Sequence, residues 1–105
     1  MITFLMFTRL APGSTRSPRE IETLEKRVIT LVRESSPDVE WLQSLAVLGP
    51  YDHVDLFRAE DLDTASRVST LVRALGNATT ELWPAVDWEL FDEPPRINSR
   101  FRGDA

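Results

Sequence analysis

The sequence predicts a single α+β domain, and three observations lead to this prediction. Its 105 residues are enough for one hydrophobic core and leave no room for a second domain. Four β-like segments and two amphipathic helical segments follow one another in the order β-α-β-β-α-β. This order contains a split βαβ unit, which places both helices on one face of a four-stranded antiparallel sheet. The expected fold is therefore a ferredoxin-like βαββαβ sandwich.

The first half of the chain supplies a strand and a long helix. Residues 2–10 are apolar at nearly every position, which is typical of a strand covered on both faces. The run Ser17-Pro18-Arg19-Glu20 is a capping box, so a helix is expected to start there. Apolar residues recur at helical spacing from Ile21 to Val32, and the helix is expected to end near Ser35-Ser36-Pro37.

The second half supplies a hairpin, a second helix and a last strand. Residues 39–48 and 51–59 flank a Gly49-Pro50 turn and are predicted to pair as a β-hairpin. Apolar residues from Leu62 to Leu75 form the second helical stripe, and Gly76 is expected to be its C-terminal cap. Residues 78–86 complete the sheet. The domain is expected to cover residues 1–93, followed by a flexible Pro- and Arg-rich tail at 94–105.

The composition argues against several classes of function. A net charge of -5 opposes nucleic-acid binding, which requires a basic surface. The chain has no cysteine and no apolar run long enough to span a membrane, so we expect a cytoplasmic protein without a membrane partner. A single histidine and scattered acids lack metal-ligand spacing, and no phosphate-binding glycine loop occurs. We therefore expect no metal and no cofactor.

Alternation along the hairpin sorts its side chains into two faces. With a two-residue turn at Gly49-Pro50, Ala46 pairs with His53, Ser44 with Asp55, and Leu42 with Phe57. The face predicted to lie under the helices carries Val39, Trp41, Gln43, Leu45, Val47, Asp52, Val54, Leu56 and Arg58. The face predicted to be open carries Leu42, Ser44, Ala46, Leu48, Tyr51, His53, Asp55 and Phe57.

The predicted open face has the composition of a ligand pocket, because apolar walls surround a few convergent polar groups. His53 is the candidate general acid or base, Asp55 would orient its imidazole, and Tyr51 would donate a hydrogen bond to a developing oxyanion. The expected pocket lining is Ser44, Leu42 and Phe57. Each candidate also has an ordinary interpretation, since a histidine near a turn is commonly a surface residue and a tyrosine commonly packs.

Several short motifs occur in order along the chain. They are Phe7-Thr8-Arg9-Leu10-Ala11-Pro12-Gly13, Leu48-Gly49-Pro50-Tyr51-Asp52, Leu75-Gly76-Asn77-Ala78-Thr79-Thr80-Glu81 and Pro84-Ala85. In these motifs the chain resembles the GYD domain family of small bacterial and archaeal proteins, named for a Gly-x-Tyr-Asp stretch. It departs from the family at Ala11-Pro12, where Thr-Pro is usual, and at His53, where an apolar residue is more common.

The resemblance implies a ferredoxin-like fold that pairs into a dimeric α/β barrel, and it implies no general activity. The expected partner is a second copy of the chain, in a homodimer or a higher oligomer. The hairpin also looks like that of the ligand-sensing domain in leucine-responsive regulators, although no helix-turn-helix precedes it in this sequence, so DNA binding is not implied.

Three functions remain open on the sequence alone. The first is a small homodimeric module that binds a small molecule on the open sheet face. The second is a cofactor-independent enzyme of the dimeric α/β barrel type, such as a monooxygenase, cyclase or isomerase acting on an aromatic or polyketide-like metabolite. The third is a structural or interaction protein without a ligand.

Overall fold

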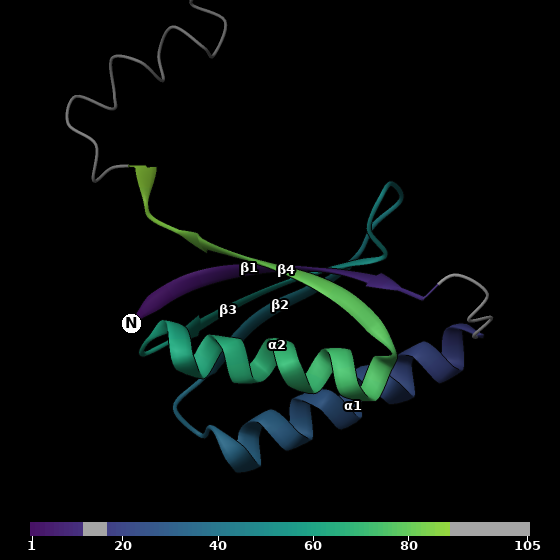
Figure 1. Cartoon of the computed structure of the whole chain (residues 1–105), viewed down its shortest axis with the longest axis horizontal. Coiled ribbons are helices and arrows are strands. Elements are labelled where there is room, and N and C mark those ends of the chain that lie inside the picture. Colours follow the sequence, from purple (N-terminus) through teal and green to yellow (C-terminus); the bar gives the residue numbers. More distant parts are fainter. Residues whose placement is uncertain (12–16, 89–105) are drawn as a thin grey trace, which may run out of the picture.

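The computed structural model describes residues 1–11 and 17–88, which form a four-stranded sheet with two helices against one face (Figure 1). The elements are β1 (Ile2–Leu10), α1 (Pro18–Ser35), β2 (Glu40–Ala46), β3 (His53–Ala59), α2 (Leu62–Gly76) and β4 (Ala78–Ala85). The strand order is β2-β3-β1-β4, and all neighbouring strands are antiparallel. The predicted ferredoxin-like fold is thus confirmed, while the predicted tail at 94–105 lies outside the described residues.

Helix α1 begins at the capping box that the sequence indicates. The Ser17 hydroxyl accepts a hydrogen bond from the Glu20 backbone N–H at 3.2 Å, and the Glu20 carboxylate accepts one from the Ser17 N–H at 2.9 Å. These two bonds satisfy backbone donors that the first helical turn would otherwise leave unpaired. The helix ends at Ser35, two residues before Pro37, as expected.

Helix α2 is capped at both ends by side chains and backbone of neighbouring residues. The Asp61 carboxylate accepts a hydrogen bond from the Thr64 N–H at 2.8 Å, and this bond lowers the pKa of Asp61. The C-cap is Asn77 in the left-handed conformation with φ 49°, so the prediction that Gly76 caps the helix was wrong. Gly76 is instead the last helical residue and lies against Leu24 of α1, where a Cβ would stand 3.4 Å from Leu24 Cδ2.

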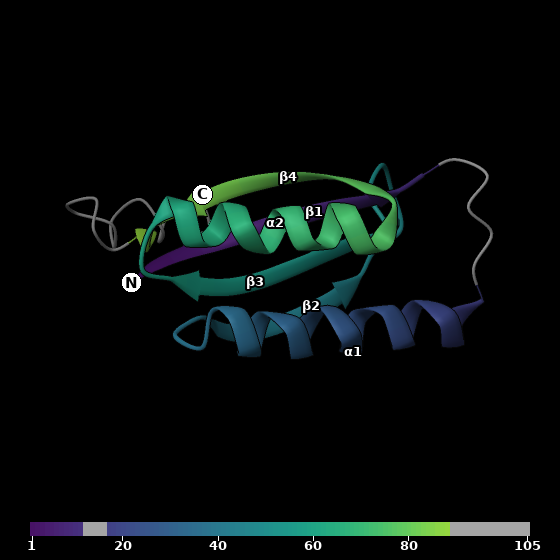
Figure 2. The same ribbon diagram turned by 60° about the horizontal axis from the view of Figure 1, so that its bottom comes forward.

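The hydrophobic core lies between the sheet and the two helices, whose ribbons Figure 2 shows from the helix side. Its centre is Phe57, which is fully buried and stacks on Phe4 at 5.7 Å and on Trp41 at 5.3 Å between ring centroids. The remaining buried apolar residues are Met6 and Ala59 from the sheet, Val28 and Val32 from α1, and Ala65, Val68 and Val72 from α2.

The structure reverses the predicted assignment of the two hairpin faces. Asp55, Phe57 and Ala59 of β3 are buried under the helices, whereas Val54 and Leu56 lie on the opposite, open face. The prediction that His53, Asp55 and Phe57 share the open face was therefore wrong. Of the apolar residues predicted to lie under the helices, Val54 and Leu56 are on the uncovered face, whereas Val39 and Trp41 pack against the core as predicted.

A bulge in β2 makes Trp41 an exception to this reversal. The pairs Ala46–His53 and Ser44–Asp55 occur as predicted, but Phe57 pairs with Trp41 instead of Leu42 because the register shifts between Trp41 and Gln43. One extra residue in a strand inverts the alternation beyond it, so Trp41 lies on the helix side, as predicted, while Ser44 on the other side of the bulge shares that side with Asp55.

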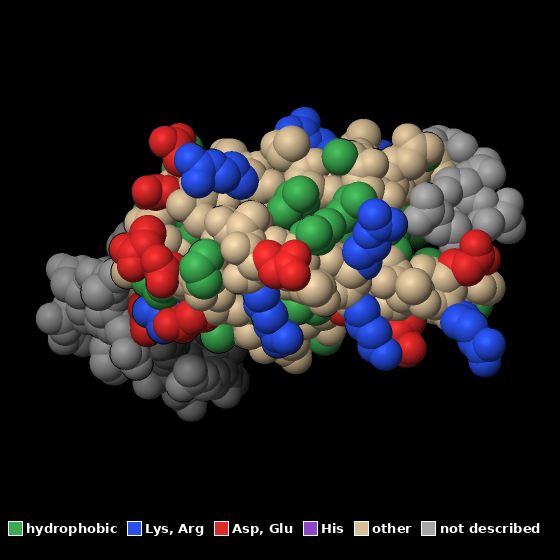
Figure 3. Space-filling model, turned by 90° about the horizontal axis from the view of Figure 1, so that it is seen from below, with side chains coloured by type: hydrophobic (Ala, Val, Ile, Leu, Met, Phe, Trp, Pro, Cys, Tyr) green, Lys and Arg blue, Asp and Glu red, His purple; other side chains and the backbone are tan. Residues whose placement is uncertain are grey.

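The helix side of the molecule shows hydrophobic side chains through the middle of its surface, among scattered Lys, Arg, Asp and Glu side chains (Figure 3). Both described helices are amphipathic, with Val28 and Val32 of α1 and Val68 and Val72 of α2 turned to the core. Neither has the long apolar stretch that crossing a lipid bilayer requires.

Candidate functional site

The six residues predicted to form the site are divided between the two faces of the sheet. His53, Asp55 and Ser44 lie on the helix side, and Tyr51 lies on the open side against Phe7, at 5.1 Å between ring centroids. Phe57 fills the core instead of lining a pocket, and Leu42, at the bulge, is half exposed. Tyr51 leaves the alternation of β3 because the strand begins only at His53.

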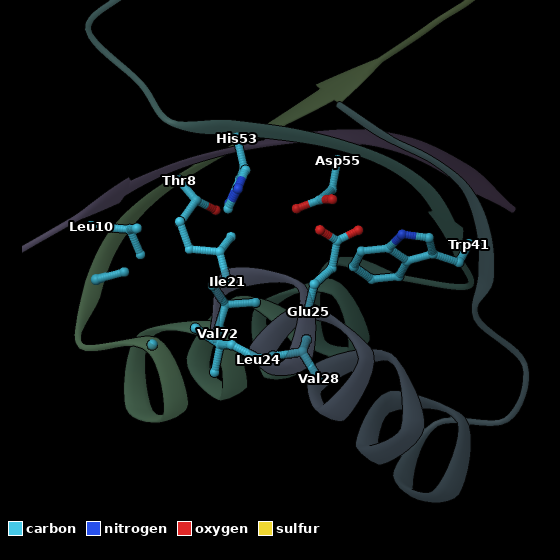
Figure 4. Close-up of a pocket in the computed structure, with 12 residues that line it drawn as sticks. Thr8, Leu10, Ile21, Leu24, Glu25, Val28, Trp41, His53, Asp55 and Val72 are labelled. Carbon is cyan, nitrogen blue, oxygen red and sulfur yellow. The ribbon is translucent and has the colours of Figure 1, made fainter. Parts of the chain in front are cut away.

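A small cavity lies between the sheet and the helices, next to His53 and Asp55 (Figure 4). We call it the inner pocket; its volume is about 40 Å³. Four of its residues have polar side chains, and they are Thr8, Glu25, His53 and Asp55. Its apolar lining consists of Leu10, Ile21, Leu24, Val28, Trp41, Val72 and Ala78, with Gly76.

A second depression adjoins the inner pocket on the side of α1. This outer groove has a volume of about 440 Å³ and shares Ile21, Glu25 and His53 with the inner pocket. Its other lining residues are Pro18, Glu22, Lys26, Ile29 and Ala46. Because the two spaces share walls, one molecule with a small polar head and an apolar tail could extend from one into the other.

The inner pocket and the outer groove form because the backbone of α1 lies closer to α2 than to the strands, which opens a gap between α1 and the sheet. Long side chains must fill the resulting gap, and Ile21, Leu24 and Val28 reach into it from one side of the helix (Figure 4). The same helical face carries Glu25, whose carboxyl group points toward that of Asp55 (Figure 4).

The protonation of Asp55 is perturbed by its surroundings in the pocket. Burial raises the pKa of Asp55 from its ordinary value of 3.8 to about 6, and the negative charge of Glu25 acts in the same direction. A hydrogen bond with the Ser44 side chain and the nearby His53 oppose this rise. A carboxyl group with such a pKa exchanges its proton near neutral pH, which is the range that acid–base chemistry requires.

Ser44 connects Asp55 to the aromatic core. Its hydroxyl oxygen accepts a hydrogen bond from the Trp41 indole N–H at 2.8 Å, while its side chain also hydrogen-bonds Asp55. Since a serine hydroxyl has one proton, it can donate to Asp55 while it accepts from Trp41. The bulge that moves Trp41 to the helix side therefore also fixes the Asp55 carboxylate.

Two polar residues of the pocket, Thr8 and Glu25, were not among the site residues predicted from the sequence. Thr8 is only 3% exposed, and its hydroxyl has no hydrogen-bond partner among the described residues. Both residues carry a sequence signal: Thr8 follows Phe4 and Met6 on the buried face of β1, and Glu25 lies within the apolar stripe of α1. A polar residue on an otherwise apolar face marks such a pocket.

Tyr51 belongs to a separate cluster on the open face. Its hydroxyl donates a hydrogen bond to the Glu81 carboxylate at 2.6 Å, and the Arg9 guanidinium lies 5.3 Å from its ring centre. The bond to Glu81 raises the pKa of Tyr51 and lowers that of Glu81. The Trp83 indole donates to the same carboxylate at 3.2 Å, so this cluster joins the hairpin to β4.

Asp52 attaches the hairpin to β1. Its carboxylate accepts a hydrogen bond from the Leu10 N–H at 2.8 Å, and its own N–H donates to the Thr8 carbonyl at 2.8 Å. The Arg9 side chain adds a bond from Nε to the Pro50 carbonyl at 2.6 Å. Tyr51 and Asp52 thus have structural roles: Asp52 joins the hairpin to β1, and Tyr51 joins it to β4.

The described residues contain no group of three or more side chains suited to hold a metal ion. The polar end of the inner pocket offers two carboxylates, an imidazole and a hydroxyl, which can bind hydrogen-bond donors and exchange protons.

Comparison with known proteins places the chain in a family. The GYD domain model matches residues 4–94. No curated protein matches the sequence. Among solved structures, the chain is similar to TTHA0845 from Thermus thermophilus, with 24% identity and a TM-score of 0.57, over 83% of this chain and 95% of that one.

Two further structures share the fold at lower identity. The hypothetical protein PHS023 from Pyrococcus horikoshii is 19% identical with a TM-score of 0.53, over 89% of this chain and 99% of that one. The leucine response regulatory protein LrpA from Mycobacterium tuberculosis is 14% identical with a TM-score of 0.55, and the match covers 82% of this chain but 51% of that one. With the domain match over most of its length, the chain belongs to the GYD domain family.

Proposed function

We propose that this protein is a small-molecule-binding module whose ligand occupies the inner pocket and extends into the outer groove. The observation that supports this most directly is the buried Thr8 hydroxyl, which lacks a partner among the described residues although it borders a cavity. A buried polar group without a hydrogen bond is destabilising, and a bound ligand would supply the missing partner. This moves the ligand from the open face expected from sequence to the helix side.

Replacement of threonine by valine tests this role, because valine keeps the shape and removes the hydroxyl. We expect Thr8→Val to raise the free energy of unfolding by about 1 kcal/mol, since no hydrogen bond is lost. The same variant should weaken ligand binding. Such opposite effects on stability and binding are typical of functional sites.

Thr80 is the matched control. It pairs with Thr8 across the sheet, but its hydroxyl is bonded to that of Ser69 at 2.6 Å. Thr80→Val should therefore lower stability by about 1 kcal/mol. Urea unfolding followed by tryptophan fluorescence compares the two variants. A loss of stability in Thr8→Val equal to that in Thr80→Val would mean that Thr8 is already bonded, and the main support for the pocket would disappear.

Acid–base catalysis in the same pocket is a second candidate function, and the position of Asp55 favours it. The pKa of about 6 allows this carboxyl group to take up and release a proton, with His53 beside it on the same wall. This retains His53 and Asp55 as candidates for a cofactor-independent enzyme, without Tyr51. His53→Ala separates the two functions: lost turnover with retained binding supports catalysis, and unchanged turnover and binding would remove His53 from the site.

We further propose that the protein is a homodimer in which a second copy covers the open face of the sheet. This face carries partly exposed apolar side chains on neighbouring strands, among them Leu5, Phe7, Leu56 and Trp83, the last of which is 47% exposed. Uncovered apolar patches of this kind favour association.

Light scattering tests the dimer. The expected mass is about twice the 12.0 kDa of the chain. Leu56→Glu, on the open face, should give a monomer, whereas Leu62→Glu, at an exposed position on α2, should leave the dimer intact. A monomeric wild-type protein at micromolar concentration would refute this proposal and leave the pocket proposal standing.

A further inference from the structure

The inner pocket carries an unbalanced negative charge. Two of its four polar side chains are carboxylates, Asp55 from β3 and Glu25 from α1, and they point toward one another (Figure 4). No lysine or arginine is among the residues that line it. In the outer groove, the Lys26 ammonium is held 3.4 Å from Glu22, both on the solvent side of α1. Acidic side chains therefore face each other across an apolar space.

A second, independent observation points to a ligand at the same place. The Thr8 hydroxyl borders this space from β1, is almost completely buried, and has no partner among the described residues. Its oxygen is free to accept a hydrogen bond from a donor inside the pocket. The pocket thus presents three groups that accept hydrogen bonds, from three different elements, and two of them are acidic.

We propose that the inner pocket binds the ammonium head of a small organic amine, with the carboxylates of Asp55 and Glu25 and the hydroxyl of Thr8 as its acceptors. This inference rests on the proposed small-molecule function and names its ligand class. A primary ammonium has three N–H donors, which matches these three acceptors. Hydrogen bonds between ionised partners are stronger than those between neutral groups.

Size and charge favour an amine over the other small ligands. The inner pocket of about 40 Å³ has room for a head group of only a few atoms, and the outer groove of about 440 Å³ can take an apolar tail along Ile21 and Ile29. An anionic head would be repelled by both carboxylates. A neutral alcohol would fill the same space without the attraction between opposite charges.

Protonation of Asp55 should compete with the amine. The groups that face Asp55 are Glu25 on α1, His53 on its own strand and the uncharged Ser44 on β2, whereas β1, α2 and β4 contribute only uncharged residues to the pocket. Since burial raises the pKa of Asp55 to about 6, the carboxylate is mostly ionised at about pH 7 and mostly protonated at about pH 5. Amine affinity should therefore fall roughly tenfold between these two pH values.

The test uses three probes with the same six-carbon chain: n-hexylammonium, hexanol and hexanoate. Binding is followed by proton–nitrogen NMR through the indole N–H of Trp41, which lines the inner pocket, with Trp83 on the open face as internal control. We expect hexylammonium to bind at least roughly tenfold more tightly than hexanol, and hexanoate to bind most weakly.

Two variants separate the pocket from general electrostatics. Asp55→Asn and Glu25→Gln should each remove most of the preference for hexylammonium over hexanol. Glu34→Gln makes the same change of charge at an exposed position of α1 and should not alter it. If Asp55→Asn does not fold, the proposal is tested by the pH dependence of hexylammonium affinity in the wild-type protein and by the Glu25→Gln variant.

The outcomes distinguish this inference from the function on which it rests. Tighter binding of hexanol or hexanoate at Trp41 would overturn the amine proposal and leave a small-molecule pocket in place. A preference for hexylammonium that survives both pocket variants, or an affinity independent of pH, would also overturn it. If no probe moves the Trp41 signal, both the amine inference and the ligand function of this pocket are wrong.

Discussion

The Asp55→Asn substitution should make the protein more stable above neutral pH, because it removes a buried charge. Burial raises the pKa of Asp55 from 3.8 to about 6, so the folded protein binds this proton more tightly than the unfolded chain does. A difference of about two pKa units corresponds to about 3 kcal/mol, because one unit is worth about 1.4 kcal/mol. The ionised carboxylate therefore destabilises the folded state by about this amount.

The sign of the effect depends on pH. A raised pKa in the folded state contributes stability that is complete below the ordinary value of 3.8 and is lost as the pH rises through about 6. Asparagine resembles the protonated acid at every pH and can still bond Ser44. The free energy of unfolding of Asp55→Asn should therefore exceed that of the wild type by about 2–3 kcal/mol at about pH 8, and by less than about 1 kcal/mol at about pH 4.

Urea unfolding at equal protein concentrations measures this difference, with tryptophan fluorescence as the signal. Asp63→Asn is the control, since Asp63 lies exposed in the first turn of α2 and should show no comparable gain. A difference between wild type and Asp55→Asn that is the same at both pH values would refute the reasoning. It would mean that the Asp55 carboxylate is solvated or paired in the folded protein.

Three further substitutions test the scaffold around the site. Asp52→Ala should lower the free energy of unfolding by about 2 kcal/mol in urea titrations, because the Leu10 N–H loses a charged partner. Tyr51→Phe should raise the pKa of Glu81, which carbon-detected NMR titration would measure, because the main cause of its lowering is the Tyr51 hydroxyl. Ser17→Ala should lower stability by about 1 kcal/mol through the lost helix cap, whereas equal stability would show that the cap is not formed in solution.

The order of elements could be predicted from the sequence because each carries a local signal. The capping box at Ser17, the apolar stripes of both helices and the Gly49-Pro50 turn depend on residues near one another in the chain. The pairings Ala46–His53 and Ser44–Asp55 followed from the turn in the same way. Local chemistry was sufficient for these features.

The faces of the sheet could not be predicted from the same signals. Strand β3 is apolar on both sides, with Phe57 and Ala59 on one and Val54 and Leu56 on the other, so the count of hydrophobic residues does not decide which side the helices cover. The bulge after Trp41 accompanies a contact with Phe57 on the neighbouring strand, and no local pattern in the sequence reveals this contact. The predicted site was therefore only partly correct: His53 and Asp55 lie together in one pocket, whereas Tyr51 lies on the opposite face of the sheet.

The bonds of Asp52 have a consequence for how the family signature should be used. Asp52 holds the backbone of β1 at Thr8 and Leu10, and Tyr51 holds β4 through Glu81, so this signature fastens the strands that carry the pocket but contributes no side chain to its lining. Because these bonds fix the register of the strands, residues at positions such as Thr8, His53 and Asp55 can be substituted without a change of strand pairing. A sequence that shares the Tyr-Asp pair with this one therefore shares its framework, and its ligand should be inferred from the residues that occupy those three positions.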